Sequence, residues 1–217
     1  IIGIATVIDC LPLYYDATNS FGLSVAALNF PENAAYYPYT ENSDNIAPFE
    51  LIPWILGQCR SIEEAYSCLN RLNITNTAFN SDTPTTPLHW IISDCKKSIV
   101  VEPTKDGICI YDNPTDVLTN NPPFPYHMSN LCNYINLSNE IQAGCLAQAL
   151  KIQPYSNGMG AIGLPGDFSS TSRFVKAAFL LSSSECEDTE QGCVSQFFHI
   201  LDAVAHTRGS VLVNKKC

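Results

Sequence analysis

Near the start of the chain, apolar residues come in short runs separated by polar turns, a pattern typical of strands. The runs at 1–8 and 23–30 flank a turn rich in Asn, Asp and Gly at 16–22, which predicts a two-stranded hairpin. Further short, β-branched runs at 88–94, 97–103 and 107–112 are separated by Asp, Lys and Gly. These three runs predict an antiparallel meander, and hence a sheet.

After the predicted hairpin, the apolar residues are spaced as in helices. Residues 48–58 form an apolar segment that tolerates Pro48 at its start, and we expect it to kink or restart at Pro53. Ser61 opens a capping box that predicts a second short helix. Its expected buried stripe consists of Ile62, Ala65, Tyr66, Leu69 and Leu72.

The second half of the chain predicts two longer helices, one over about 172–182 and one beginning after Asp188. The apolar face of the later helix consists of Val194, Phe197, Phe198, Leu201, Val204 and Ala205. Strands and helices are therefore segregated along the chain. This segregation predicts an α+β layer architecture.

Length and charge restrict what the protein can be. The 217 residues contain no linker or charge block, which predicts a single domain over 1–217. The formal net charge of −10 argues against nucleic acid as a partner, because neutralising phosphates needs clustered cations. No apolar run approaches the roughly 20 residues of a membrane span. The opening residues lack the basic flank of a signal peptide, so we expect a buried strand there.

The ten cysteines show no C-x-x-C pair and no zinc-type Cys/His spacing, so no metal and no cofactor are expected. A chain of this size can bury a core without disulfides, which favours free, largely buried thiols. The compartment stays open at this point, and we favour the cytoplasm.

The segment 158–173, GMGAIGLPGDFSSTSR, combines four glycines and a Pro-Gly pair with a run of Ser, Thr and Asp. The glycines predict tight turns, and the side-chain oxygens after them can cap the helix that follows. Arg173 then falls in a first helical turn, where a cation is unfavourable beside the helix dipole. It is either a structural arginine paired to a carboxylate or one placed beside a site where negative charge develops.

The run LPGDFSSTSRF at 164–174 resembles the choloylglycine hydrolase family, which includes bile salt hydrolases and penicillin V acylases. The runs at 22–31, 88–104 and 117–124 match the same family in the same order. The resemblance covers nearly all of this chain but only the middle of the family's domain. It implies the four-layer αββα sandwich of N-terminal nucleophile hydrolases, incomplete in this chain.

The resemblance also implies site residues. Asn29 matches an asparagine whose side-chain amide helps form the oxyanion hole. Asn120 matches a second active-site asparagine, and Arg173 matches an arginine near the catalytic cysteine. In the family an N-terminal cysteine is the nucleophile and its own α-amino group is the base. The present chain begins with Ile1, and Cys10 falls on a surface loop, so neither is expected to act as the nucleophile.

The resemblance also indicates two candidate residues for substrate binding. Ile8 and Phe79 match loops that border the acyl pocket in relatives, although packing is the alternative role for both. The four histidines have no paired spacing. His89, within LHWII, is interpreted as a satisfied sheet residue without a role.

Taken together, these residues and the resemblance predict a hydrolase of linear amide C–N bonds other than peptide bonds. Conjugated bile salts are the leading substrate class, with penicillin V or N-acyl amides next. We expect this chain to be a fragment that lacks the nucleophile and is inactive alone, and the complete enzyme to be a homotetramer. The alternative is a pseudoenzyme that uses the same fold as a ligand-binding or interaction module. A papain-like protease is set aside, because its local cysteine signature is missing.

Overall fold

The structure, a computed structural model, describes residues 1–141 and 152–212, which form two compact units. The first unit comprises residues 1–124 and the second residues 125–217. The expectation of a single domain over 1–217 stays a prediction.

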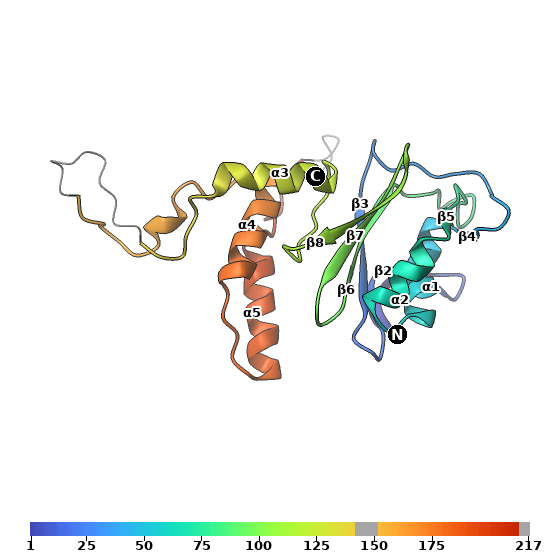
Figure 1. Cartoon of the computed structure of the whole chain (residues 1–217), viewed down its shortest axis with the longest axis horizontal. Helices are drawn as coiled ribbons and strands as arrows, with labels where there is room; N and C mark the ends of the chain where they lie inside the picture. Colours follow the sequence, from blue (N-terminus) through green and yellow to red (C-terminus); the bar gives the residue numbers. More distant parts are fainter. Residues whose placement is uncertain (142–151, 213–217) are drawn as a thin grey trace. The chain divides into compact units, whose positions relative to one another are not determined.

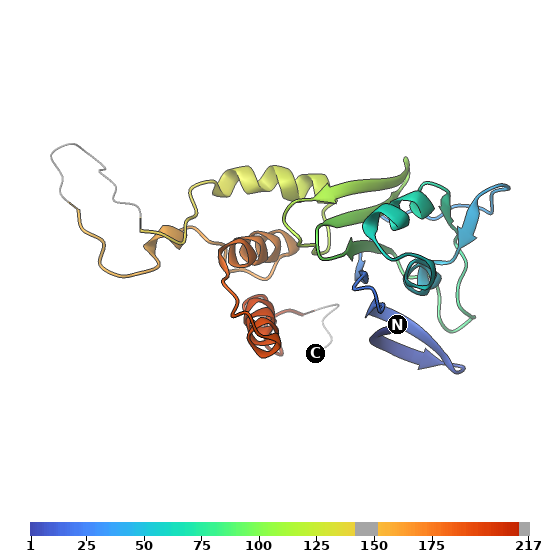
Figure 2. The same ribbon diagram turned by 60° about the horizontal axis from the view of Figure 1, so that its bottom comes forward.

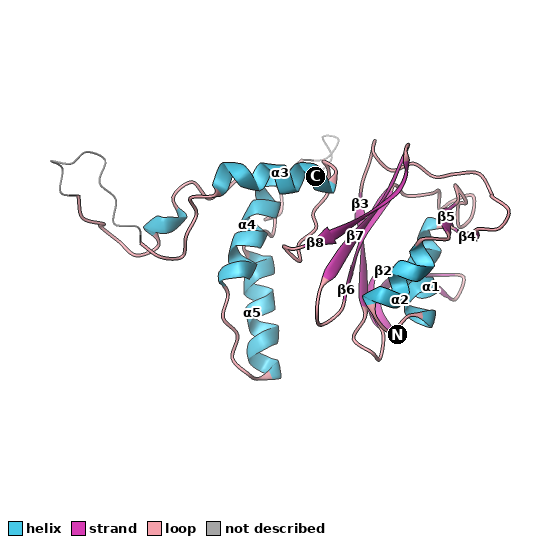
Figure 3. Ribbon diagram, in the orientation of Figure 1, coloured by secondary structure: helices cyan, strands magenta, loops and turns pink. Residues whose placement is uncertain are grey.

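The first unit is built on a six-stranded sheet in which every neighbouring pair is antiparallel. Its order is β1 (Ile2–Ile8), β2 (Leu11–Thr18), β3 (Ser24–Asn29), β6 (Leu88–Ser93), β7 (Ser98–Thr104) and β8 (Gly107–Asn113). Two short parallel strands, β4 (Asp44–Ile46) and β5 (Leu72–Ile74), form a second sheet. The meander predicted from residues 88–112 is confirmed as β6, β7 and β8 (Figure 3).

The N-terminal hairpin was predicted wrongly, because three strands occupy residues 2–29 where two were expected. Asp9 and Cys10 both adopt positive φ, of 50° and 65°, and form a two-residue turn that pairs Ile8 with Leu11. Such turns are usually marked by glycine, and the Asp-Cys pair carries no such signal. β1 and β2 form a hairpin that extends from the rest of the sheet (Figure 2).

Two helices cover one face of this sheet (Figure 1). A short 3₁₀ helix, η1 (Pro48–Glu50), leads directly into α1 (Leu51–Gln58), and α2 (Ile62–Leu69) follows. The restart expected at Pro53 occurs at Leu51 instead, because Pro53 lies in the first turn of α1, where a missing N–H is tolerated. The Ser61 side chain accepts from the Glu64 N–H, which confirms the predicted cap.

The predicted stripe of α2 is only partly correct. Its buried residues are Ile62, Ala65 and Leu69, whereas Tyr66 is 42% exposed. Leu72 is buried in strand β5 rather than in the helix. The core between helices and sheet contains Leu23, Val25, Leu51, Ile55, Ile62, Trp90, Ile92, Ile99 and Val101.

The second unit is mainly helical, with α4 (Ser170–Ser183) and α5 (Glu190–Asp202) as its longest elements. The shorter helices are α3 (Phe124–Asn130), whose first residue belongs to the first unit, η2 (Leu131–Tyr134) and η3 (Met159–Ala161). α4 buries Phe174, Val175 and Ala177. α5 has no buried residue, and the apolar face expected for it is exposed at Val194, Phe197, Phe198 and Leu201. Among the described helices, none has the length and apolar character of a membrane span.

The expectation of largely buried thiols is wrong for the described cysteines. All eight are free, but only Cys59 is buried. Cys68 and Cys109 are partly exposed, and the other five, namely Cys10, Cys95, Cys132, Cys186 and Cys193, are exposed.

Candidate active site

The structure brings Asn29 and Asn120 together in the first unit. Asn29 is the last residue of β3, and its backbone carbonyl accepts a hydrogen bond from the Asn120 side-chain amide at 2.9 Å. The neighbouring Asn121 amide donates to the Pro31 carbonyl at 2.7 Å. The segment that carries Asn120 is therefore fastened to the end of β3 at two points. The Asn29 side chain itself is exposed at this end of the sheet.

A buried carboxylate supports the same segment from within. Glu102, on β7, has no exposed surface, and its Oε1 accepts from the Phe124 backbone N–H at 2.9 Å. The same oxygen lies 3.1 Å from Nδ1 of His89, which is fully buried on β6. The His89 ring stacks on Phe30, the residue after Asn29, with ring centroids 4.3 Å apart. The His89–Glu102 pair thus connects both asparagine-bearing segments.

The energetic consequence of this pair comes from its burial. Within the described residues, His89 Nε2 and Glu102 Oε2 have no hydrogen-bond partner. Removing one member of a buried, paired charge leaves the other uncompensated and costs several kcal/mol. We interpret the pair as positioning residues for the Asn29 and Asn120 segments.

Sequence reasoning missed this pair, because it left His89 without a role and did not single out Glu102. A signal was present in the sequence. One polar residue interrupts each of two apolar runs, LHWII and SIVVEP. Strands β6 and β7 are antiparallel, and Trp90 pairs with Val101. This register sets His89 opposite Glu102.

Arg173 lies in the second unit, on the helix that the glycine-rich segment opens. Gly158 and Gly163 have φ values of 81° and 98°, which confirms the expected tight turns. The Ser169 side chain caps α4 by accepting from the Ser172 N–H. Asp167 accepts from the Ser169 N–H at 2.9 Å and from the Ser172 hydroxyl at 2.5 Å. Hydrogen bonds from Ser169 and Ser172 lower the pKa of Asp167 to about 2.

Arg173 occupies the first turn of α4, as predicted. Its Nε donates to the Phe168 carbonyl at 3.2 Å, and partial burial lowers the pKa of its guanidinium. These contacts hold the side chain beside the cap of its own helix. Asn29 and Asn120 belong to the other unit, so the joint role of the three residues stays a prediction.

The substrate candidates lie at two other places in the first unit. Ile8 is half-buried at the end of β1, next to the turn that holds the exposed Cys10. Phe79 is half-buried in the loop after β5, and its ring packs edge-on against Phe49 at 5.3 Å between centroids. Both residues retain accessible surface, which a contact with substrate requires.

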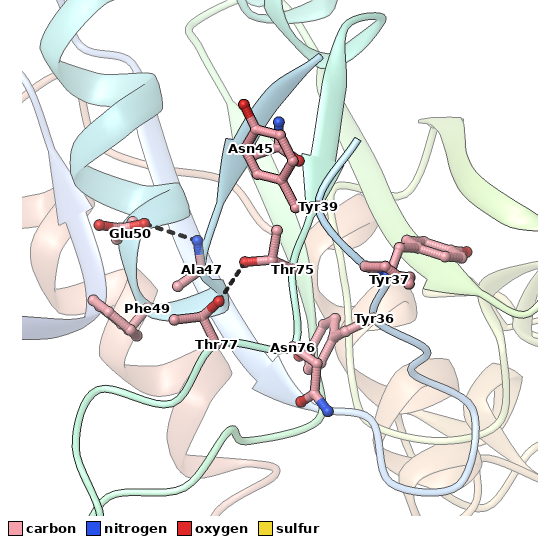
Figure 4. Close-up of a pocket in the computed structure, with 11 residues that line it drawn as sticks. Tyr36, Tyr37, Tyr39, Asn45, Ala47, Phe49, Glu50, Thr75, Asn76 and Thr77 are labelled. Carbon is pink, nitrogen blue, oxygen red and sulfur yellow. Dashed lines mark hydrogen bonds between the residues drawn. The ribbon is translucent and has the colours of Figure 1, made fainter. Parts of the chain in front are cut away.

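An open pocket of about 580 Å³ lies beside Phe49 (Figure 4). It is lined by residues 36–39, 45, 47, 49, 50 and 75–77. Several of its polar groups are already bonded within the protein, such as Glu50, whose Oε2 accepts from the Ala47 N–H. The Tyr36 hydroxyl donates to the Thr86 carbonyl and accepts from the Leu88 N–H. Since Leu88 pairs with Asn29 in the sheet, Tyr36 connects this pocket to the strand end that carries the asparagine.

The chemistry of the site rests on amide and carboxylate groups. In the described part of the chain, no three His, Cys, Asp or Glu side chains are grouped in a way that could hold a metal ion. An exposed side-chain amide at a rigid strand end can donate to a developing oxyanion.

Comparison with known proteins gives a consistent result. The family model for linear amide C-N hydrolases, choloylglycine hydrolase family, matches residues 1–217. A bile salt hydrolase/transferase from Lactiplantibacillus plantarum is 49% identical over 209 residues, which is 96% of this chain and 64% of that protein. A conjugated bile acid hydrolase from Lactobacillus gasseri is 38% identical over 217 residues, which is 99% of this chain and 68% of that protein. The chain spans about two thirds of the length of these relatives.

Solved structures agree on the fold. A variant of the conjugated bile acid hydrolase from Clostridium perfringens matches with a TM-score of 0.89 and 36% identity, over 99% of this chain and 66% of that one. Penicillin V acylase from Agrobacterium tumefaciens matches with a TM-score of 0.71 and 21% identity, over 94% of this chain and 55% of that one. The expected α+β fold of the N-terminal nucleophile hydrolases is confirmed.

Proposed function

The chain belongs to the choloylglycine hydrolase family of linear amide C-N hydrolases, and we propose that the protein hydrolyses conjugated bile salts at the amide bond. The observation that carries this proposal is the contact between Asn29 and the Asn120 side chain at the end of β3. Relatives at 49% and 38% identity are a bile salt hydrolase/transferase and a conjugated bile acid hydrolase. Their identities cover nearly the whole chain, which favours the same reaction class here.

In the proposed reaction, a cysteine thiolate attacks the amide carbonyl and a tetrahedral oxyanion forms. The Asn29 side-chain amide donates to that oxyanion, and each such preorganised donor lowers the barrier by about 3–4 kcal/mol. Collapse of the intermediate expels glycine or taurine, which takes up a proton as it leaves. Water then hydrolyses the thioester, releases the bile acid and restores the thiol.

Asn120 is assigned two functions in this scheme. Its side-chain nitrogen already donates to the Asn29 carbonyl, and this bond fixes the strand end. Its side-chain oxygen is then directed to the amino group of the nucleophilic residue. Arg173 is assigned to the neighbourhood of the cysteine, where its positive charge favours the thiolate and the anionic intermediate. Its lowered pKa reflects burial and still leaves it a cation at neutral pH.

The nucleophile of this proposal is an N-terminal cysteine, as the family resemblance implies, and none of the described cysteines of this chain. Cys10 is exposed in a two-residue turn, and Cys59 is buried behind α1 with a pKa raised to about 12 by burial. Burial and the raised pKa keep the Cys59 thiol protonated and out of reach of a substrate at neutral pH. Residues 1–217 alone are therefore expected to leave amides uncleaved.

Ile8 and Phe79 are proposed, from the family resemblance, as residues that contact the acyl group. Phe49 packs edge-on against the Phe79 ring, and Phe49 itself lines the open pocket. An apolar wall of this kind suits a steroid skeleton. Replacing Phe79 by Ala is expected to raise KM for bile salts several-fold while kcat changes little.

The first experiment is to determine the N-terminal residue of the protein from its source by intact mass and terminal sequencing. The purified protein is then incubated with glycocholate, taurocholate and penicillin V, and the released amine or acid is quantified by mass spectrometry. Release of glycine or taurine supports the proposal. Cleavage of penicillin V alone would move the substrate to the acylase class, and binding without cleavage would favour the pseudoenzyme.

Variants connect the activity to the site. Asn29→Ala is expected to lower kcat by 10²–10³-fold, the range for the loss of one oxyanion donor. The matched control is Asn33→Ala, since Asn33 lies a few residues further on and its side-chain amide donates to the nearby Pro31 carbonyl. A loss of equal size in both variants would argue against the assignment of Asn29.

A homotetramer is proposed as the assembled form, by analogy with the family alone. Multi-angle light scattering of the native protein gives its mass directly. A mass four times that of the polypeptide supports the proposal, and a monomer refutes it.

A further inference from the structure

Two exposed cysteines of the second unit lie close enough to react with each other. Cys186 follows α4 and Cys193 lies in α5, next to its first turn, and their sulfur atoms are 2.7 Å apart. A covalent S–S bond is about 2.05 Å long, so a shift of well under 1 Å would form it. The two helices are packed side by side in this unit (Figure 2). Cys186 lies in the connection between them, and Cys193 lies near the start of α5.

The backbone around the pair is already folded into the geometry that a bond needs. Cys193 Sγ also donates to the Glu187 carbonyl at 3.6 Å, and the Thr189 N–H donates to the same carbonyl at 2.7 Å. Gly192 allows this approach, because a Cβ at that position would lie 2.7 Å from the Glu187 Cβ. The connection between the helices is thus folded tightly onto the start of α5.

We propose that Cys186 and Cys193 form a reversible intramolecular disulfide, a modification site that small neutral disulfides oxidise. The Cys186 thiolate attacks one sulfur of the oxidant and forms a mixed disulfide with it, while the other sulfur of the oxidant leaves as a thiolate and takes up a proton. The Cys193 thiolate then attacks Cys186 in this mixed disulfide and releases the second thiol. Two electrons pass from the protein to the oxidant, which is reduced to two thiols.

The surrounding charge determines which oxidant suits the site. Four acidic residues, Glu185, Glu187, Asp188 and Glu190, surround the pair in sequence. A neutral oxidant avoids their repulsion, whereas an anionic one does not. The hydrogen bond with Cys193, followed by burial and nearby negative charge, raises the pKa of the Cys186 thiol. Oxidation is therefore expected to accelerate between pH 7 and pH 9 as the thiolate fraction increases.

A second cysteine pair in the first unit provides an internal control. Cys59 and Cys68 have sulfur atoms 3.6 Å apart, but Cys59 is 2% exposed and burial raises its pKa to about 12. Burial hinders both the approach of an oxidant and the formation of a thiolate. This pair is expected to stay reduced under conditions that oxidise Cys186 and Cys193.

The test uses the whole protein after reduction and removal of reductant. It is incubated with bis(2-hydroxyethyl) disulfide, blocked with N-ethylmaleimide in denaturant, digested with a glutamate-specific protease and analysed by mass spectrometry. Because Glu187 and Glu190 lie between the cysteines, cleavage leaves two peptides that only a disulfide holds together. The expected result is this linked pair, formed at least about tenfold faster than a Cys59–Cys68 bond.

Variants test whether the bond depends on the closeness of Cys186 and Cys193 or only on the reactivity of exposed thiols. Cys193→Ser should leave Cys186 as a mixed disulfide or thiol, whereas Cys68→Ser should leave the linked peptides unchanged. Gly192→Ala keeps both thiols, but its added Cβ forces the connection between α4 and α5 away from the start of α5. The rate of disulfide formation should therefore fall several-fold. Equal rates in Gly192→Ala and the parent, or a preference of Cys186 for another cysteine, would overturn the proposal. The readout is a mass, so it is the same whether or not the protein cleaves amides.

Discussion

Strands β1 and β7 belong to the same sheet, and β1 is the more apolar of the two, yet it is β7 that is buried. Six of the seven residues of β7 are buried, whereas no residue of β1 is. Ile2, Ile4 and Val7 are 85%, 66% and 67% exposed, while Ile99, Val100 and Val101 are fully buried. β1 is the edge strand of the sheet, and β7 lies between β6 and β8 beneath the helices.

The comparison shows that apolar composition identifies a strand but not its place in a sheet. The residues around Asn29 and Asn120 depend on the buried part, because Glu102 belongs to β7 and His89 to its neighbour. Changes in β7 should therefore affect both folding and the site. Changes at the exposed residues of β1 before Ile8 should affect neither strongly.

The largest effect is expected from Glu102→Ala in β7. The substitution leaves the Phe124 N–H and His89 without their shared acceptor, and the free energy of unfolding should fall by about 3–5 kcal/mol. Urea denaturation measures the change. Glu102→Gln keeps an acceptor and should recover part of the loss. If Glu102→Ala costs less than about 1 kcal/mol, β7 does not support the site as described.

A large effect is also expected from Ile99→Ala in the same strand. Ile99 is fully buried and belongs to the core between the sheet and its helices. Removing its methyl groups leaves a cavity, and the expected cost is about 2–4 kcal/mol. Thermal unfolding followed by circular dichroism should show a clearly lower midpoint. A cost below about 0.5 kcal/mol would mean that the core at β7 can collapse freely.

Tyr36 is expected to make a moderate contribution to the free energy of unfolding that depends on pH. Its hydroxyl accepts a hydrogen bond from the Leu88 N–H, in the middle of the sheet. Burial raises its pKa to about 12, against about 10 in the unfolded chain. The folded state therefore holds the proton more tightly, and stability should fall as the pH rises from 10 to 12, by at most about 1.4 kcal/mol per unit. Tyr36→Phe should reduce this slope in urea titrations between pH 9 and pH 12. An unchanged slope would contradict the assignment.

The smallest effect is expected from Ile4→Ala in β1, the same substitution as at Ile99 but on the edge strand. Ile4 is 66% exposed, so the free energy of unfolding should change by less than about 0.5 kcal/mol. Equilibrium unfolding of the two alanine variants in parallel checks the comparison directly. Similar costs at positions 4 and 99 would show that β1 is covered in solution.

The strands and helices could largely be predicted from the sequence, because their apolar periodicity is local. The meander at 88–113 and the capped helices after Ser61 and Ser169 were confirmed. The turn at Asp9 and Cys10 could not be found, since its positive φ values have no glycine to announce them. The exposure of α5 could not be found either, because periodicity identifies an apolar face but not what covers it.

The site was predicted through its resemblance to a family rather than through local pattern. Asn29 and Asn120 are 91 residues apart in sequence, and their contact depends on the tertiary fold. The His89–Glu102 pair was missed because its two residues meet only through strand register. Sequence patterns within one element therefore predict elements well, and contacts between elements poorly.

The bond between the Phe124 N–H and Glu102 also has a mechanical consequence. Phe124 is the last residue of the first unit, so the chain leaves that unit directly after a backbone group held by a buried carboxylate. A pulling force applied at Pro125 would load this bond and the buried Phe124 ring first, and then the bonds of Asn121 and Asn120 to the end of β3, before it reached β8. The end of the first unit would then resist extension at several successive points, and the strands behind it would separate only after these had yielded.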